Sequence, residues 1–186
     1  ATAKIKAING TDPLSYINKR NPSYWVISSE RRITWLEQPA NNNPINEGEW
    51  WSDNPSDKMY ISFDHDAAKD LGIQINDNIT MNIYGRDIIG IVKNFRNVDY
   101  ADFTINFVMV LNTNYAQSIP HEYIGTVKLS NQHNFQEYAL LQQFPNISSI
   151  KISNYAEKIN QLLNQVNICL LYTSDAADDK LWGGVG

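Results

Sequence analysis

The run Asp64-His65-Asp66 holds residue types that often ligate metal ions in proteins. Adjacent residues at the start of a helix point in different directions, however, and do not easily converge on one ion. Asp64 is better placed to cap a short helix, and both carboxylates are favoured by the positive end of the helix dipole. The spacing therefore predicts a helix start rather than a metal site.

The other histidines form no catalytic pattern. His121-Glu122 and the isolated His133 have no partner at a recognisable catalytic spacing. The sequence has no nucleophile elbow, no phosphate-cradling glycine loop and no HExxH motif. Ser and Asp are abundant, so a hydrolytic triad assembled in three dimensions remains an alternative. We predict a protein without enzymatic activity and without a cofactor.

Aromatic residues are the remaining candidates for binding. In a basic groove they would stack on nucleic-acid bases, but residues 1–168 hold 14 basic and 17 acidic residues, so we expect no nucleic-acid partner. Most of these aromatics are expected in the core. A minority near the long segment 38–58 is expected to form a surface for a partner protein or an apolar substrate. The candidates for this surface are Trp50, Trp51, Tyr100 and Phe103.

The last eighteen residues differ in composition from the rest of the chain. Residues 1–168 contain 23 Asn and 22 Ile, and residues 169–186 contain neither. Asn and Ile have A/T-rich codons, so the shift indicates a change of DNA source, and CLLYTSDAAD resembles the translated end of a transposase adapter used in shotgun sequencing. We interpret 169–186 as an adapter artefact and exclude it from fold reasoning. The alternative is a flexible natural tail.

Excluding residues 169–186 changes which kinds of site the composition of the chain allows. The single cysteine, Cys169, lies in the excluded segment, so disulfides, zinc-thiolate sites and thiol nucleophiles are not expected. The chain contains no apolar run of about 20 residues, the length needed to span a membrane, and no signal peptide. It begins with Ala rather than Met, so both ends are possible cuts in a longer protein.

The first third of the chain is predicted to hold short elements and a long loop. Residues 4–10 alternate in polarity like a strand that ends in a turn, and Asp12-Pro13 is a helix start with Asn21-Pro22 as its stop. The β-rich runs 24–27 and 33–36 predict either a hairpin or a strand followed by a loop. Residues 38–58 are rich in Pro, Asn, Gly and Asp and predict a loop of unusual length, which in compact domains is usually functional or disordered. Its tryptophans argue against disorder.

Period-two alternation dominates residues 59–95. A strand over 60–63 precedes a helix that Asp64 caps and Gly72 ends in a left-handed conformation. Strands are then expected over 79–83 and 88–92, joined by a hairpin turn around Gly85. We therefore predict a small β-rich lobe.

The remaining elements are strands over 107–111, 125–129 and 147–152, with a helical stripe between 131 and 144. Asn154 and Glu157 have capping-box spacing at the start of a closing helix. Its apolar residues recur at helical spacing; they are Tyr155, Ile159, Leu162, Leu163 and Val166. No stop signal ends this helix, so we expect it to continue into a further segment.

Several separated segments, taken together, resemble one family. They are ITWLEQPANNNPINEGEWW, the run ISFDHDAAKDLGIQINDNITMNIYGRDIIGIVKNFRNVDYADFTINFVMVL, and AEKINQLLNQV. In this order they resemble the extracytoplasmic domain of FtsX/MacB-type ABC transporter permeases, in particular the YbbP-like branch. Asn76 stands where that family usually has Gly, and Tyr100 where it usually has Trp. Both keep the chemistry, because Asn tolerates left-handed turns and Tyr is a large amphipathic aromatic.

The resemblance implies an α+β fold, a mixed α/β lobe with a smaller β-rich lobe inserted, as in a MacB-like periplasmic core. Residues 1–58 would begin the α/β lobe, 59–111 would form the β-rich lobe, and 112–168 would complete the α/β lobe and lead toward a missing transmembrane segment. It also implies a periplasmic domain of a bacterial inner-membrane permease.

The partners that the resemblance implies are a separate ATP-binding cassette subunit, the permease's own transmembrane helices, and a periplasmic partner protein or an apolar, lipid-like substrate. The closing helix would transmit movement of the transmembrane helices to the domain outside the membrane. The alternative is a free periplasmic binding module for an apolar ligand.

Overall fold

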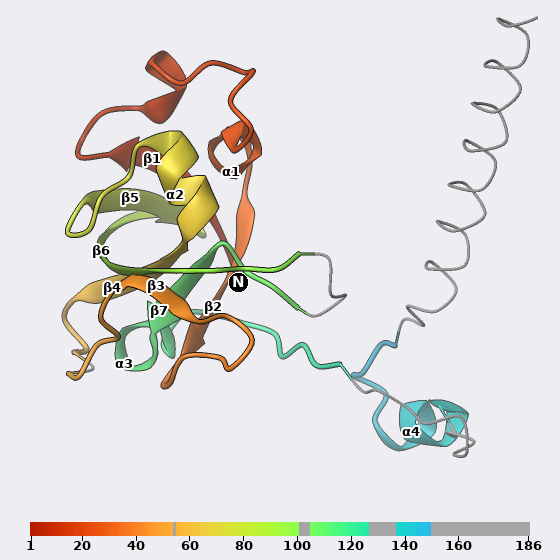
Figure 1. Cartoon of the computed structure of the whole chain (residues 1–186). Helices are drawn as coiled ribbons and strands as arrows, with labels where there is room; N and C mark the ends of the chain where they lie inside the picture. Colours follow the sequence, from red (N-terminus) through yellow and green to blue (C-terminus); the bar gives the residue numbers. More distant parts are fainter. Residues whose placement is uncertain (54, 101–104, 127–136, 150–186) are drawn as a thin grey trace, which may run out of the picture. The chain divides into compact units, whose positions relative to one another are not determined.

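The computed structural model describes residues 1–53, 55–100, 105–126 and 137–149 (Figure 1). The chain divides into two compact units, residues 1–127 and residues 128–186, which are considered separately. The strands of the first unit are β1 (Thr2–Ile8), β2 (Arg31–Leu36), β3 (Ile45–Gly48), β4 (Met59–Asp64), β5 (Asn78–Ile83), β6 (Arg86–Arg96) and β7 (Met109–Asn112). Its helices are η1 (Pro13–Ser15), α1 (Tyr24–Ser28), α2 (His65–Leu71) and α3 (Thr113–Ala116).

The strands form one mixed sheet that closes on itself. Its order is β3-β6-β4-β7-β2-β1-β5, and a further pairing of β5 with β6 closes it, so that of the described strands only β3 lies outside the closed part. The β2–β7 and β4–β6 pairs are parallel, and the others are antiparallel. We call the six strands other than β3 the closed sheet.

β6 explains how the sheet closes. This strand has 11 residues, and its first half pairs with β5 while its second half pairs with both β4 and β3. The inner face is apolar, since Ile61, Phe63 and Val92 are completely buried. Burial of such side chains contributes most of the stability of a domain of this size. The functional residues must therefore lie on the outer face or at the ends of the strands.

The local signals around α2 are confirmed. The Asp64 carboxylate accepts a hydrogen bond from the Ala67 amide at 3.1 Å, and Gly72 ends the helix with φ = 71°. Asn76 also adopts the left-handed region, with φ = 70°, a conformation that Asn tolerates. The β5–β6 hairpin turns at Tyr84 and Gly85, which have φ values of 49° and 84°. The strands predicted over 4–10, 33–36 and 107–111 also correspond to β1, β2 and β7.

Three local predictions are wrong. Residues 24–27 were expected to be β structure but form helix α1, whose Val26 and Ile27 are completely buried. The helix expected after Asp12 is only the short turn η1, although Asp12 does cap it by accepting from the Leu14 amide. The long loop 38–58 contains strand β3, which pairs with β6.

The predicted lobe boundary at residue 58 has no counterpart in the sheet. β1 pairs with β5, and β2 pairs with β7, so the strands before residue 58 complete the same closed sheet as those after it. A single apolar core contains residues from both segments, such as Ile5, Ile33 and Met109. Residues 59–111 therefore do not form a separate lobe. Periodicity predicted the strands but not their partners.

In the second unit, the described residues 137–149 contain α4 (Glu137–Gln143), within the predicted helical stripe. Residues 147–149 belong to no strand, which contradicts that part of the strand predicted over 147–152. Residues 125 and 126 are also outside any strand. The rest of these two predicted strands lies outside the described residues.

Candidate functional site

A groove of about 220 Å³ opens on the surface where β2 and the segment before β7 diverge. The two strands are parallel partners from Ile33 and Met109 onward, so the residues just before these positions form its sides. The side chains come from α1, β2 and the segment leading into β7. They are Trp25, Glu30, Arg31, Arg32, Tyr100, Asn106, Phe107 and Val108. We call this site the aromatic groove.

Two exposed aromatic side chains dominate the groove. Trp25 is 40% exposed and Tyr100 is 52% exposed, high values for side chains of this size. Their ring centroids lie 6.2 Å apart with an interplanar angle of 86°, an edge-to-face contact. Such a contact is favourable between aromatic rings and fixes their relative orientation. The pair thus offers apolar surface in a fixed geometry to a bound molecule.

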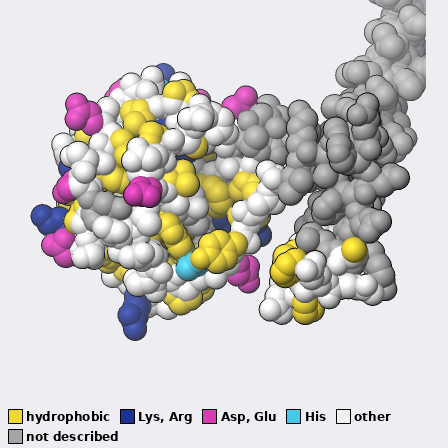
Figure 2. All heavy atoms as spheres, turned by 90° about the horizontal axis from the view of Figure 1, so that it is seen from below, with side chains coloured by type: hydrophobic (Ala, Val, Ile, Leu, Met, Phe, Trp, Pro, Cys, Tyr) yellow, Lys and Arg dark blue, Asp and Glu magenta, His cyan; other side chains and the backbone are white. Residues whose placement is uncertain are grey.

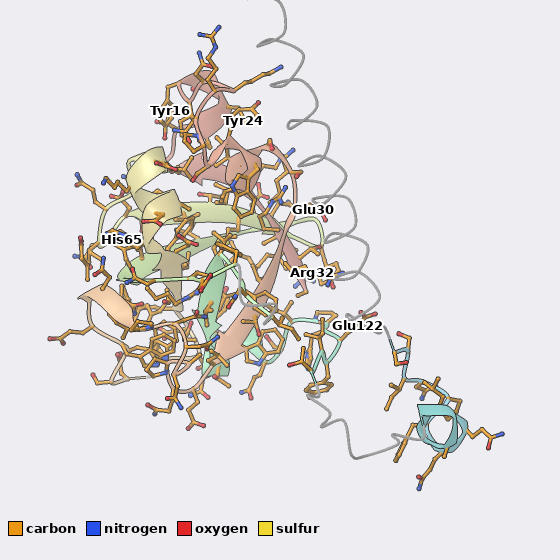
Figure 3. The ribbon with its side chains drawn as sticks, turned by 45° about the vertical axis from the view of Figure 1, so that its right-hand side comes forward. Tyr16, Tyr24, Glu30, Arg32, His65 and Glu122 are labelled. Atoms are coloured by element: carbon orange, nitrogen blue, oxygen red, sulfur yellow. The ribbon has the colours of Figure 1, made fainter. Side chains whose placement is uncertain are left out.

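The charged residues give the groove a basic character. The Arg31 guanidinium lies 5.1 Å from the centroid of the Trp25 ring, within the range of a cation–π interaction. Glu30 accepts a hydrogen bond from the Thr2 hydroxyl at 3.1 Å, and Glu30 and Arg32 lie on the same side of the molecule (Figure 3). On the face shown in Figure 2, acidic and basic side chains are scattered, and at one edge a basic side chain lies beside acidic ones. The lining of the groove thus includes two arginines and one acidic residue.

Tyr100 is held in place by a buried acidic residue. Its hydroxyl donates to Asp64 Oδ2 at 2.8 Å, and Asp64 is only 4% exposed. Burial, followed by the hydrogen bond to Asp64 and its negative charge, raises the pKa of Tyr100 well above its usual value. The hydroxyl therefore stays protonated and keeps donating at physiological pH.

Arg96 is the third member of this network. It pairs with Asp64 in the register of β4 and β6, and its guanidinium donates to the Phe107 carbonyl. Burial lowers the pKa of Arg96 to about 10, while Tyr100 and Asp64 act in the opposite direction. At neutral pH Arg96 is still charged, and Asp64 acts on it through charge, although among the described residues Arg96 Nε and Nη1 have no hydrogen-bond partner. The aromatic groove is thus connected to the N-terminus of α2.

The other predicted surface residues are placed differently. Trp51 is 8% exposed, so it is not a contact surface in this structure, and its ring packs 3.9 Å from that of Trp50 and 6.5 Å from that of Tyr60. Trp50 is half-buried and donates to the Glu37 carbonyl at 3.0 Å. Of the three described candidates only Tyr100 lies in the groove, and Phe103 is outside the described residues. The coupling-helix residues 155–166 are also outside them.

His65 and His121, two of the histidines considered in the sequence, lie close to polar groups. His65 lies 3.6 Å from Glu47 and 3.2 Å from Asp66. The Nδ1 atom of His121 is 2.8 Å from the Ile119 carbonyl, and its ring packs edge-on against Trp35. Within the described part of the chain, no group of three or more His, Cys, Asp or Glu residues is arranged to hold a metal ion. His133 is not among the described residues.

Sequence reasoning missed Trp25, Arg31 and Arg32 as site residues. Trp25 lies in a run that favours β structure, and it was assigned to the core with most other aromatics. A usable signal was present, because SERR places two arginines shortly after an aromatic pair. What could not be read from the sequence is that the segment before β7 lies beside them, since β2 and β7 are far apart in the chain.

Comparison with known proteins gives a distant similarity. No protein-family model matches the chain, and no solved structure matches it, so the MacB-like core stays a prediction. Over 134 residues the chain is 24% identical to an Escherichia coli (strain K12) protein described as an uncharacterized ABC transporter permease, YbbP. The chain is distantly similar to an ABC transporter permease. The aligned part is 72% of this chain and 16% of that protein.

This similarity supports a permease-related role for the chain. No helix in the described residues has both the length and the apolar character to cross a membrane.

Proposed function

We propose that the chain is part of the permease subunit of a bacterial ABC transporter, and that residues 1–127 form a domain on the periplasmic side of the inner membrane. The similarity over 134 residues to YbbP carries this proposal. In this role the chain is not an enzyme. ATP would be hydrolysed by a separate cytoplasmic subunit, and this domain would contact the substrate or a periplasmic partner.

Within this role, the aromatic groove is the contact site. Trp25 and Tyr100 expose apolar surface, while Arg31 and Arg32 supply positive charge beside it. Tyr100 is fixed by its hydrogen bond to buried Asp64 and Trp25 by the cation–π contact. Groups that are ordered before binding lose less conformational entropy when a ligand arrives. We propose that the groove takes an apolar molecule with an anionic group, which includes lipid-like substrates.

Coupling to the membrane is assigned to the closing helix. The segment with Tyr155, Ile159, Leu162, Leu163 and Val166 would connect this domain to a transmembrane helix, and a continuous hydrogen-bonded helix transmits displacement with little internal compliance. Insertion of Gly-Gly next to Asn160 in the full-length permease should abolish transport and leave assembly with the ATP-binding subunit intact. Unchanged transport in that variant would contradict the coupling role.

The permease assignment itself is tested by the uninterrupted gene. The expected result is a stretch of about 20 consecutive codons for apolar residues on each side of this region, with an ATP-binding subunit encoded nearby. A reading frame that stops shortly after codon 168 with polar residues only would favour the alternative, a free periplasmic binding module for an apolar ligand.

The groove is tested with two probes that differ in charge. Dodecanoate and dodecyltrimethylammonium carry the same apolar chain, so binding below their micelle concentrations, followed by tryptophan fluorescence, isolates the effect of the head group. Dodecanoate should bind at least about ten-fold more tightly, and Trp25→Ala should weaken it about ten-fold. Tyr84→Ala is the matched control, because Tyr84 is 62% exposed at the β5–β6 turn. Equal affinity for both probes, or an unaffected Trp25→Ala variant, would refute the assignment.

A further inference from the structure

The two arginines of the aromatic groove have different surroundings. The Arg31 guanidinium lies 5.1 Å from the centroid of the Trp25 ring and donates to the Ser29 carbonyl at 3.4 Å and to the Ser29 hydroxyl. Within the part of the chain that the structure describes, the exposed Arg32 side chain has no hydrogen-bond, ion-pair or aromatic partner. An anion at Arg31 would compete with contacts already made, whereas an anion at Arg32 would displace only water. Arg32 is therefore the better placed of the two to bind an anion.

The contacts of Arg31 concern the apolar part of the groove instead. Ser29 follows the last residue of α1 and holds the Arg31 guanidinium, which lies over the ring of Trp25. The edge-to-face contact with Tyr100 restricts the same ring from another direction. Loss of Arg31 would leave the Trp25 ring with fewer contacts to fix its orientation. We therefore expect Arg31 to affect the binding of an apolar molecule whatever the charge of that molecule.

Glu30 limits how much negative charge the groove can accept. Its carboxylate accepts a hydrogen bond from the hydroxyl of Thr2, the register partner of Arg32 on β1, and Figure 3 shows Glu30 and Arg32 on the same side of the molecule. Among the described residues, Glu30 forms no ion pair with an arginine of the groove. The lining thus carries two positive charges and one negative charge. A singly charged anion neutralises this set, whereas a doubly charged one leaves a net negative charge beside Glu30.

From these observations we infer that Arg32 binds the head group of the ligand, and that the groove selects amphiphiles with one negative charge, of which a carboxylate is the best match. The planar guanidinium presents its N–H donors in a fork that fits the two oxygens of a carboxylate. Arg31 is a positioning residue that acts through Trp25. This inference rests on the proposed function of the aromatic groove and names the substrate class of that site.

Two substitutions with the same charge change separate the roles of the arginines. Arg31→Gln and Arg32→Gln each remove one positive charge from the groove, so a difference between them reports direct contact with the head group. Calorimetric titration of the full chain with dodecanoate and with dodecyltrimethylammonium, below their micelle concentrations, gives the affinity ratio of the two probes. Lys69→Gln is the control, because Lys69 is exposed on α2 and does not line the groove.

The two variants should differ in this ratio. Arg32→Gln should reduce the preference for dodecanoate from at least about ten-fold to about two-fold or less. Arg31→Gln should weaken both probes about three-fold or more and keep at least about half of the preference. Arg32→Lys should restore part of the preference, because it keeps the charge and loses the fork.

Glu30→Gln tests the selection for a single charge. At about pH 8.5 dodecyl phosphate carries close to two negative charges, because the second pKa of a phosphate monoester is about 6, whereas dodecanoate carries one. At low ionic strength the wild type should bind dodecanoate at least about three-fold more tightly than dodecyl phosphate, a difference typical of surface charges. Glu30→Gln should remove most of this difference.

The outcomes distinguish this inference from the function on which it rests. The inference is overturned if Arg32→Gln keeps the preference for dodecanoate, if Arg31→Gln removes the preference equally, or if Glu30→Gln leaves the ratio of dodecanoate to dodecyl phosphate affinity unchanged. In these cases the groove remains a contact site as long as Trp25→Ala weakens binding. A wild-type chain that binds none of the three amphiphiles would refute the proposed role of the groove, and this inference with it.

Discussion

Gly90 lies at a tightly packed position in the closed sheet. It pairs with Met59 across β4 and β6, and a Cβ there would lie 2.6 Å from Ile61 Cδ1 and 2.9 Å from Met59 Cε. Carbon atoms in contact are normally about 3.5–4.0 Å apart, so the Ile61 and Met59 side chains would have to move to accept one methyl group. We expect Gly90→Ala to lower the free energy of unfolding by about 1–3 kcal/mol, the usual cost of overpacking a core.

A second substitution shows whether the cost arises at this contact. Ile61→Val removes Cδ1, the atom nearest to the added methyl, but keeps Cγ1, which would lie 2.8 Å away. Alone it should cost about 0.5–1.5 kcal/mol. In the double variant the two substitutions should partly compensate, with a coupling energy of at least about 0.5 kcal/mol.

The assay is urea unfolding followed by both tryptophan fluorescence and far-ultraviolet circular dichroism, with coincident transitions as the test of two-state behaviour. Gly85→Ala is the control, because a Cβ there has no neighbour within 4 Å and only its φ of 84° is unfavourable. Additive effects of Gly90→Ala and Ile61→Val, or a cost for Gly90→Ala below about 0.5 kcal/mol, would refute the packing described for the inside of the closed sheet.

Two further predictions concern the network behind the aromatic groove. In urea unfolding, Asp64→Ala should lower the free energy of unfolding by at least about 2 kcal/mol, because α2 loses its cap and buried Arg96 loses its acidic neighbour. Asp66→Ala is the control, since the Asp66 side chain is 94% exposed. An equally small cost for both substitutions would contradict the prediction. Tyr100 has its pKa raised above the usual 10.0 by burial and by Asp64, so the folded state holds this proton more tightly than the unfolded chain does. The stability that Tyr100 adds is therefore present below pH 10 and lost as the pH rises above it. The difference in unfolding free energy between wild type and Tyr100→Phe should shrink in alkaline solution. A difference that stays constant with pH would contradict the prediction.

Sequence patterns predicted an element correctly where its formation depends on residues next to it in the chain. Asp64 and Gly72 bound a helix through contacts that lie within the helix itself, so their types were sufficient to place it. The turn at Gly85 follows from the same local chemistry. By contrast, Tyr24–Ser28 became helical although its residues favour strands. The preceding segment is fixed by distant groups, since Ser23 donates to the Asp70 carboxylate at 2.7 Å, and such contacts override weak propensities.

The site was harder to predict than the fold, for a related reason. Tyr100 could be named from its aromatic character, but its neighbours Trp25 and Arg31 reach it only because β2 and β7 run in parallel. Trp51 was expected on the surface because it lies in a polar loop, whereas the β3–β6 pairing brings that loop down onto Tyr60. Both errors come from pairings between residues that are far apart in the sequence.

The pairing of the first strand with β5 also has a consequence during synthesis. A ribosome adds about 5–20 residues per second, so β1 (Thr2–Ile8) is made roughly 4 to 15 seconds before β5 (Asn78–Ile83). In that interval β1 can contact η1, α1 and β2, but Ile5 and Ile8 lack their register partners Met81 and Ile79 on β5. The nascent chain therefore exposes part of the apolar surface of β1 until β5 has been made.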